Sequence, residues 1–536
     1  MMDYSSMKHI RAYFKTAKER IASYPHIDIV GLLLAVGAYI GFVFAHISTW
    51  SIWFDEAFTA YLVRFNYVDI ARYTATDVHP PLYYWVVKAW TSLWGTSELA
   101  FRSFSMVCGA LAIVLGFVLI KKLFGKRAAV LGAWLMALSP MFIRYGEEAR
   151  MYTMVTAIVF AATYMLIRAM ETNERKYWVW YGILIALGMW THYFAALAWL
   201  AHWVWRYVSL KFVDGYRKKE LRHRFFTKEW LWTHALAIGI FLAWAPFMLR
   251  QLGLIQMGFW IPAVSAHTFT NYFTNVLFYL EQQKVESWFA LVYMMVIGLA
   301  GFLLYKVYRQ SPRKADRKHM LLFASLAFTP PLLLFVASMP PLKSSFVERY
   351  LIPASAALML LLAVLIAKGV RTKFRKASLL LALLLVVSFA FGINRVYYYG
   401  NYNKNSNTSI RTKELVAEIS KKAQPGEPLI ATDPWVFYEA VFYTTKEHPV
   451  YFLEQTTDYK YGSLDMLKGS DQFKIKDLNS FVKDYPKVWY FGNVGSGEVN
   501  PPSIAHGWKQ IDDIDAYDPI NDSSAYKGRE YLTNAE

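Results

Sequence analysis

The sequence predicts a polytopic α-helical membrane protein that ends in a small α/β domain outside the membrane. Three observations carry this prediction: of 536 residues 56% are hydrophobic and only 18% are charged, the apolar runs are long, and the final quarter of the chain changes character. Soluble domains are usually about a quarter charged, so the composition favours a lipid environment.

The apolar runs divide the first 394 residues into about eleven expected spans. A run of about 18 or more apolar residues can cross the hydrocarbon core as a helix. The bilayer offers free backbone groups no partner, so these runs must be helical. The expected spans are residues 29–47, 101–120, 128–144, 152–169, 177–191, 194–210, 231–249, 287–306, 320–338, 350–367 and 378–394.

The basic connections between these runs predict the orientation. When the spans alternate, the basic segments all fall on one side, which the positive-inside rule makes cytoplasmic. The basic, amphipathic segment 1–28 has no cleavage site of the signal-peptide type, so we expect it to be retained in the cytoplasm. An odd number of spans then places everything after Asn394 outside. The basic segments are Lys8–Arg20, Lys121–Arg127, Arg175–Lys176, Lys211–Lys228, Lys306–Lys318 and Lys368–Lys376.

The net charge of +18 is distributed according to this topology. Residues 395–536 contain 16 Lys and Arg against 20 Asp and Glu, a balance of −4, so residues 1–394 carry +22. Because that excess lies in short loops between apolar runs, it does not indicate a nucleic-acid surface. The single cysteine, Cys108, excludes an intramolecular disulfide.

Two outer-side segments are long. The first, 48–100, contains an aromatic amphipathic stretch from Leu82 to Trp94 that we expect to lie along the membrane interface. The second, 250–286, holds polar residues including Gln251 and His267.

The tail, residues 395–536, predicts a compact α/β unit. Its helical patterns alternate with short strand-like runs, and turn signals such as Pro425-Gly426 separate them. The expected helices are 408–423, 435–443 and 477–485, and the expected strands are 428–432, 449–453 and 488–492.

Polar clusters lie at the outer ends of the predicted spans. Asp55-Glu56 follows the first span; Asp77 and His79 precede Pro80-Pro81, which fixes the backbone. The other members are Arg102, Glu147, Glu148, Arg150, His192, Tyr193, Glu348 and Arg349.

Each cluster also has a structural interpretation. Asp55-Glu56 could be a solvated acidic turn, Asp77 a helix cap, and Glu147 a salt-bridge partner of Arg144. The arginines and histidines could anchor the interface. Together, however, they place cations and carboxylates on one membrane face. Cations suit a phosphate leaving group and a carboxylate suits deprotonation of a hydroxyl. The sequence has no phosphate-binding loop of the Walker type and no zinc-ligand spacing.

These motifs resemble the protein O-mannosyltransferases and their bacterial glycosyltransferase family 39 relatives. The resemblance rests on Asp55-Glu56, the Asp77-to-Leu82 motif with its His-Pro-Pro core, Arg102, Glu148-Ala149-Arg150-Met151-Tyr152 and Arg349-Tyr350-Leu351. It spans about residues 29–367 and is strongest over 50–155. Two departures are Glu147, where many bacterial members have Gln, and a tail unlike the repeat domain of the eukaryotic enzymes.

The resemblance implies a GT-C fold and a polyprenyl-phosphate sugar donor, with a glycan, lipid or protein as acceptor. It implies that Asp55 is the base, with Glu56 and Glu148 as further catalytic carboxylates. Arg102, with Arg150 and Arg349, is expected to bind the donor phosphate. Asp77, His79, His192 and Tyr193 are expected to orient the substrates. A divalent metal ion is an open possibility, and no other cofactor is expected.

Two other classes remain open from the sequence. A transporter or flippase for lipid-linked sugars would favour ionisable groups near the middle of the membrane and paired repeats. A non-catalytic receptor would leave the clustered carboxylates without a role. The position of the polar clusters at the outer ends of the spans favours an enzyme.

Overall fold

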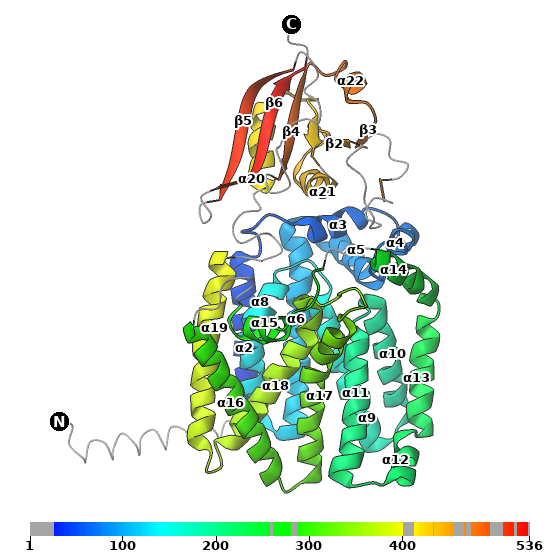
Figure 1. Ribbon diagram of the computed structural model, residues 1–536, viewed down its shortest axis with the longest axis vertical. Coiled ribbons are helices and arrows are strands. Elements are labelled where there is room, and N and C mark those ends of the chain that lie inside the picture. The colour runs from blue at the N-terminus through cyan, green and yellow to red at the C-terminus, as the bar shows by residue number, and fades with distance from the viewer. Residues whose placement is uncertain are drawn as a thin grey trace, which may run out of the picture.

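The computed structural model describes residues 26–257, 261–279, 287–399, 412–432, 434–453, 466–467, 473–493, 508–518 and 523–533. They form a bundle of upright helices with an α/β unit above one end (Figure 1). Most of the predicted cytoplasmic segment 1–28 lies outside the described residues.

Seven helices of the described chain are long and apolar enough to cross a membrane by themselves. All seven coincide with expected spans, which confirms a multi-pass membrane protein. They are α2 (Ile27–His46), α6 (Glu98–Phe124), α9 (Tyr152–Thr172), α16 (Ser287–Gln310), α17 (Lys314–Ala337), α18 (Ile352–Gly369) and α19 (Arg375–Tyr399). The last continues past the predicted domain boundary at residue 394.

Two further expected spans are bent helix pairs. Helices α7 (Lys126–Ala137) and α8 (Pro140–Gly146) meet at 62°, and α13 (Lys228–Phe241) meets α14 (Ala245–Met257) at 70°. Pro140 explains the first break, because proline cannot donate the hydrogen bond that would continue α7. With these pairs the described chain has up to nine candidate spans.

The remaining two expected spans are α10 (Arg175–Thr191) and α11 (Ala195–Val208), which continues as a π-helical turn over Ser209–Asp214. At 17 and 14 residues they are shorter than the other spans, although they run alongside them (Figure 1). The count of eleven therefore stays a prediction.

The first outer loop forms a helical platform on the bundle. It contains α3 (Phe54–Leu62), α4 (Tyr67–Thr74) and α5 (Leu82–Trp94), and the last of these has the bounds of the predicted amphipathic stretch. The platform lies between the bundle and the α/β unit (Figure 1). The second outer loop contains α15 (Thr268–Phe278) and most of α14.

The tail folds around a six-stranded sheet in the order β3-β2-β1-β4-β6-β5. Four parallel strands, β1 (Leu429–Ala431), β2 (Val450–Leu453), β3 (Lys474–Ile475) and β4 (Lys487–Asn493), are extended by the antiparallel pair β5 (Lys509–Asp518) and β6 (Ser523–Leu532). Its helices are α20 (Thr412–Lys422), α21 (Pro434–Tyr443) and the short α22 (Leu478–Phe481). The sequence predicts β1, β2, β4 and the three helices, but not β3, β5 or β6.

Helix α21 joins the tail to the platform. The ring of Tyr438 packs against Phe54, Phe58 and Tyr61 of α3, with centroids 6.0, 6.2 and 5.1 Å apart. The Tyr443 hydroxyl accepts a hydrogen bond from the Ile52 backbone N–H at 2.6 Å and donates to Glu98. The tail therefore contacts the segment that leads into Asp55.

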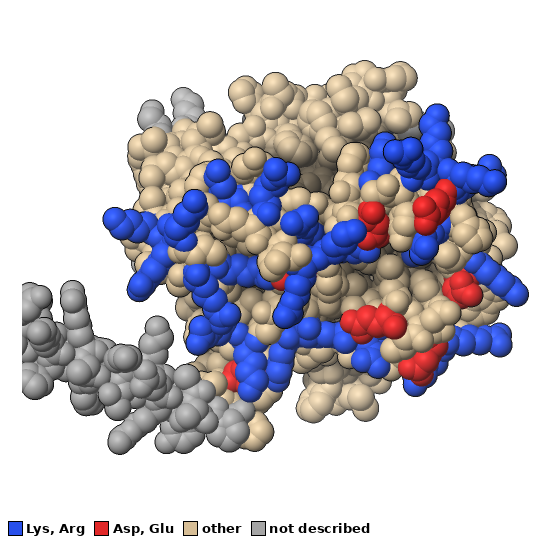
Figure 2. Space-filling model, turned by 90° about the horizontal axis from the view of Figure 1, so that it is seen from below, with Lys and Arg blue, Asp and Glu red and all other residues tan. Residues whose placement is uncertain are grey.

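The opposite end of the bundle is basic. Figure 2 shows Lys and Arg side chains gathered over this face, with few carboxylates among them. Buried Asp28 at the start of α2 pairs there with Lys121 at 2.6 Å and Lys126 at 3.3 Å. The basic segments of the described residues thus lie together, as the positive-inside rule requires.

Tyr39 packs between two glycines in the bundle. A methyl group on Gly109 would lie 2.0 Å from the Tyr39 hydroxyl, and one on Gly146 would lie 2.2 Å from it. We expect Gly109→Ala to destabilise the protein by about 1–3 kcal/mol, because overpacking forces neighbouring groups to move. Thermal unfolding in detergent measures this, and Gly37→Ala, which meets nothing within 4 Å, is the matched control. Equal melting temperatures for the two variants would contradict the prediction.

Candidate active site

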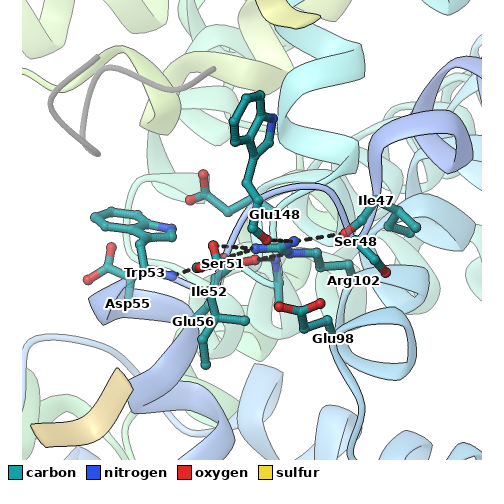
Figure 3. Close-up of polar contacts among 12 residues, drawn as sticks. Ile47, Ser48, Ser51, Ile52, Trp53, Asp55, Glu56, Glu98, Arg102 and Glu148 are labelled. Carbon is teal, nitrogen blue, oxygen red and sulfur yellow. Dashed lines mark hydrogen bonds and ion pairs between the residues drawn. The ribbon is translucent and has the colours of Figure 1, made fainter. Parts of the chain in front are cut away.

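Arg102 and Glu56 form a buried ion pair beneath the platform. The two guanidinium–carboxylate hydrogen bonds measure 2.8 Å for Nε to Oε1 and 2.7 Å for Nη2 to Oε2. Arg102 also donates to the carbonyl oxygens of Ile47, Trp50 and Ser51 at 2.8 to 3.1 Å (Figure 3). An arginine has five N–H donors, and these contacts use all five.

This geometry bears on the predicted roles of both residues. All five Arg102 donors have partners within the protein, which favours a structural role over the predicted binding of the donor phosphate. The Glu56 carboxylate also accepts from the backbone N–H groups of Ala149 at 2.9 Å and Trp53 at 3.4 Å. Since Glu56 is only 2% exposed, we assign the pair to holding together segment 47–53, α3, α6 and the 147–151 turn.

Asp55 faces the other way. It lies in the first turn of α3, and Figure 3 shows its carboxylate pointing away from Arg102 while Glu56 points toward it. Its Oδ2 lies 3.5 Å from Arg349 Nη2 and 3.8 Å from Arg150 Nε. The Asp55 side chain is 19% exposed whereas both guanidinium groups are buried, at 2% and 4%. Asp55 is therefore an accessible carboxylate between two buried cations.

A chain of polar contacts leads from Asp77 to Arg150. Asp77 Oδ2 lies 3.2 Å from His79 Nδ1, and His79 Nε2 lies 3.2 Å from Arg150 Nη2. Because arginine can only donate, Nε2 must accept, and the His79 proton is on Nδ1 facing Asp77. Burial lowers the pKa of His79 although the hydrogen bond with Asp77 opposes this shift, which agrees with a neutral ring. Asp77 is thus no helix cap: α5 begins at Leu82 with Pro81 before it.

Aromatic side chains surround the two arginines. Tyr84 Oη lies 3.3 Å from Arg150 Nη1, and the Arg349 guanidinium lies 5.3 Å from the Trp53 ring centroid. The rings of Tyr152 and Tyr350 are 6.3 Å apart. These aromatic residues belong to motifs that the sequence shows, but only their place in the fold identifies them as the wall of a site.

His192 is one of the remaining expected site residues that lie in the same cluster. The His192 ring lies 5.8 Å from the His79 ring and 4.8 Å from the Tyr350 ring, so His192 joins the cluster. Burial lowers the pKa of His192 well below its ordinary value, and its Nδ1 accepts from the Phe194 N–H.

Tyr193 and Glu148 have structural contacts. The Tyr193 hydroxyl donates a hydrogen bond to Gln251 Oε1. The Gln251 amide nitrogen in turn donates to the Thr74 carbonyl at 2.7 Å, which connects α14 to the platform. Glu148 pairs with Arg144 at 2.9 Å and is fully buried. The structural interpretation of the sequence paired Arg144 with Glu147, whereas the structure pairs Arg144 with Glu148. A catalytic role of Glu148 stays a prediction.

The residues fit a metal ion poorly. Within the described part of the chain, no three His, Cys, Asp or Glu side chains lie close enough together to hold one. The partly exposed Asp55 carboxylate has two guanidinium neighbours that would repel a cation.

Comparison with known proteins agrees with this architecture. Residues 78–248 match the family model described as dolichyl-phosphate-mannose-protein mannosyltransferase. The structure is similar to ArnT from Cupriavidus metallidurans in the apo state, with a TM-score of 0.60 and 12% identity over 94% of this chain and 98% of that one. The same protein bound to undecaprenyl phosphate gives the same values.

A more distant likeness is to the oligosaccharyltransferase of Archaeoglobus fulgidus, with a TM-score of 0.49 and 12% identity over 80% of this chain and 64% of that one. No curated protein sequence matches the chain. The family match and the shared GT-C fold confirm the resemblance to the O-mannosyltransferase group that the motifs indicate.

Proposed function

We propose that the protein transfers a sugar from a polyprenyl-phosphate donor to an acceptor hydroxyl, with inversion at the anomeric carbon. The observation that carries the proposal is Asp55, a partly exposed carboxylate held beside buried Arg150 and Arg349. The family model for mannosyl transfer from dolichyl phosphate and the undecaprenyl phosphate bound to ArnT support this class of donor.

In the proposed reaction Asp55 accepts the proton of the acceptor hydroxyl, whose oxygen attacks the anomeric carbon. The bond from that carbon to the phosphate oxygen breaks, and polyprenyl phosphate leaves with the electron pair. Arg150 and Arg349 meet the phosphate charge, and Asp77 and His79 hold Arg150 in place. The energy of transfer is in the donor's phosphoester, so the reaction needs no ATP.

We further propose that the site and the tail lie on the extracytoplasmic side, with the basic face of Figure 2 in the cytoplasm. The acceptor is a glycan, lipid or protein, and the tail helps to hold it without supplying a catalytic group.

The proposed orientation predicts that a thiol introduced at Lys218 should react only with reagents that enter the cytoplasm. Labelling from outside would reverse the orientation.

The test of the function uses purified protein and a panel of polyprenyl-phosphate sugars with candidate acceptors. Release of polyprenyl phosphate, measured by mass spectrometry, is expected for one sugar of the panel. A flippase would return every donor intact, and that result across the panel would argue for the transport alternative.

Arg349→Gln should weaken donor binding by about 10- to 100-fold, because hydrogen bonds to a charged group contribute about 1.5–3 kcal/mol. The affinity for the polyprenyl-phosphate sugar is measured by isothermal titration. Arg371→Gln removes a charge from the turn between α18 and α19 and should leave the affinity unchanged. Wild-type affinity in Arg349→Gln would remove this residue from the donor site.

A further inference from the structure

A hollow of about 410 Å³ lies between the first turns of α10 and α13, far from Asp55. Its lining residues are Asn173, Arg175, Trp178, Lys228, Glu229 and Trp232. Both helices stand at the edge of the bundle (Figure 1), and both begin at the basic end. The hollow therefore opens at the level where the helices leave the membrane.

The charged walls suit an anion that also carries hydroxyl groups. Arg175 and Lys228 are exposed cations from two neighbouring helices, and both line the hollow; cations of this kind pair with phosphate. Glu229 adds a carboxylate that can accept hydrogen bonds from hydroxyl groups but would repel a second phosphate.

Two tryptophans line the hollow and indicate that it lies at the membrane interface. Trp178 is 5% exposed, and its indole N–H donates to Asn173 Oδ1 at 3.1 Å. Trp232 is 39% exposed, and the Arg175 guanidinium lies 5.5 Å from its ring centroid. Tryptophan is enriched at the boundary between acyl chains and headgroups, where its ring is partly apolar and its N–H is wet.

The close packing of α10 on α13 ends the hollow on its membrane side. A Cβ on Gly182 would lie 2.9 Å from the Thr233 carbonyl oxygen, and the Thr233 hydroxyl donates to the Trp178 carbonyl at 3.3 Å. A headgroup in the hollow therefore cannot pass further between the two helices.

We propose that this hollow binds the headgroup of one anionic glycerophospholipid that carries free hydroxyl groups, of the phosphatidylglycerol type. Its phosphate pairs with Arg175 and Lys228, its hydroxyl groups donate to Glu229, and its glycerol backbone lies beside Trp232. The site is independent of the sugar-transfer reaction.

Native mass spectrometry of the full chain in detergent tests this with phosphatidylglycerol and phosphatidylcholine of identical acyl chains. We expect one phosphatidylglycerol to bind at least tenfold more tightly. Each cation near an anionic lipid contributes about fivefold, so Arg175→Gln with Lys228→Gln should lower that affinity by about 25-fold. The control, Arg371→Gln with Lys373→Gln, removes two charges from the same face but not from the hollow.

Three outcomes would overturn the proposal. Equal binding of the two lipids would show that the hollow does not distinguish their headgroups. An equal loss of phosphatidylglycerol affinity in both double variants would show a general charge effect. If free glycerol phosphate bound as tightly as the lipid, the ligand would be a soluble phosphate ester. Both double variants should retain wild-type melting temperatures, so a folding defect is recognised separately.

Discussion

Asp55→Asn should lower the turnover of sugar transfer by about 10²–10⁴-fold, the contribution typical of a general base. Asparagine keeps the shape of the side chain but cannot take the proton of the acceptor hydroxyl. Donor affinity should not fall, because the substitution removes a negative charge from beside Arg150 and Arg349 and leaves both cations to the phosphate. Single-turnover rates and donor titration separate the two effects.

The matched control is Asp69→Asn, which removes a carboxylate from the same platform but on α4, where Asp69 accepts from Asn66 at 2.7 Å. It should transfer sugar at close to the wild-type rate. Near-normal transfer by Asp55→Asn would remove Asp55 from the role of base. A large loss of donor affinity would instead place it in donor binding.

Arg102→Ala should destabilise the protein by about 3–5 kcal/mol, since it leaves the Glu56 carboxylate buried without its cation. Three backbone carbonyls between residues 47 and 51 lose their donors as well. Denaturant or thermal unfolding in detergent measures the loss. Arg64→Ala, which removes an exposed arginine of the platform from its contact with Val441, is the control and should have a small effect.

A double-mutant cycle distinguishes this role from phosphate binding. If Arg102 serves Glu56, the double variant Arg102→Met with Glu56→Leu should lose less stability than the two single changes added together. Additive losses, together with weakened donor binding in folded Arg102→Ala, would restore the phosphate role that the sequence suggested.

The helical bundle could be predicted from the sequence because membrane spans obey few constraints. Length, apolarity and flanking charge sufficed to locate α2, α6 and α9, and they also located α16 to α19. The same rules could not detect the breaks after α7 and α13, because a break changes direction without changing hydropathy. Pro140 and Pro246, each in the first turn of the second helix of its pair, were the signals in the sequence.

The tail was less predictable. Buried strands such as β1 and β4 are apolar and stand out from their flanks, but β5 reads Lys-Gln-Ile-Asp-Asp-Ile-Asp-Ala-Tyr-Asp and resembles a solvated loop. Aspartate is depleted in strands, and the edge position of β5 is what tolerates it. Only its pairing with β6 along the full length of the hairpin reveals it.

The site shows the same limit at the level of single residues. Sequence position brought Asp55, Asp77, His79, Arg102 and Arg150 to one membrane level, and the structure does bring them close together. It could not tell that Arg102 turns inward to Glu56 while Arg150 and Arg349 turn toward Asp55. That division depends on which face of α3 each carboxylate occupies, and neighbours in a helix point about 100° apart.

The bond between Tyr443 and the Ile52 N–H bears on the modularity of the molecule. Although the tail has its own sheet, it holds the backbone three residues before Asp55, and Tyr438 packs on the helix that carries this carboxylate. A chimera that exchanged the tail alone would join a foreign α21 to this α3. A chimera that keeps its activity should therefore exchange residues 48–62 and the tail together, as one unit.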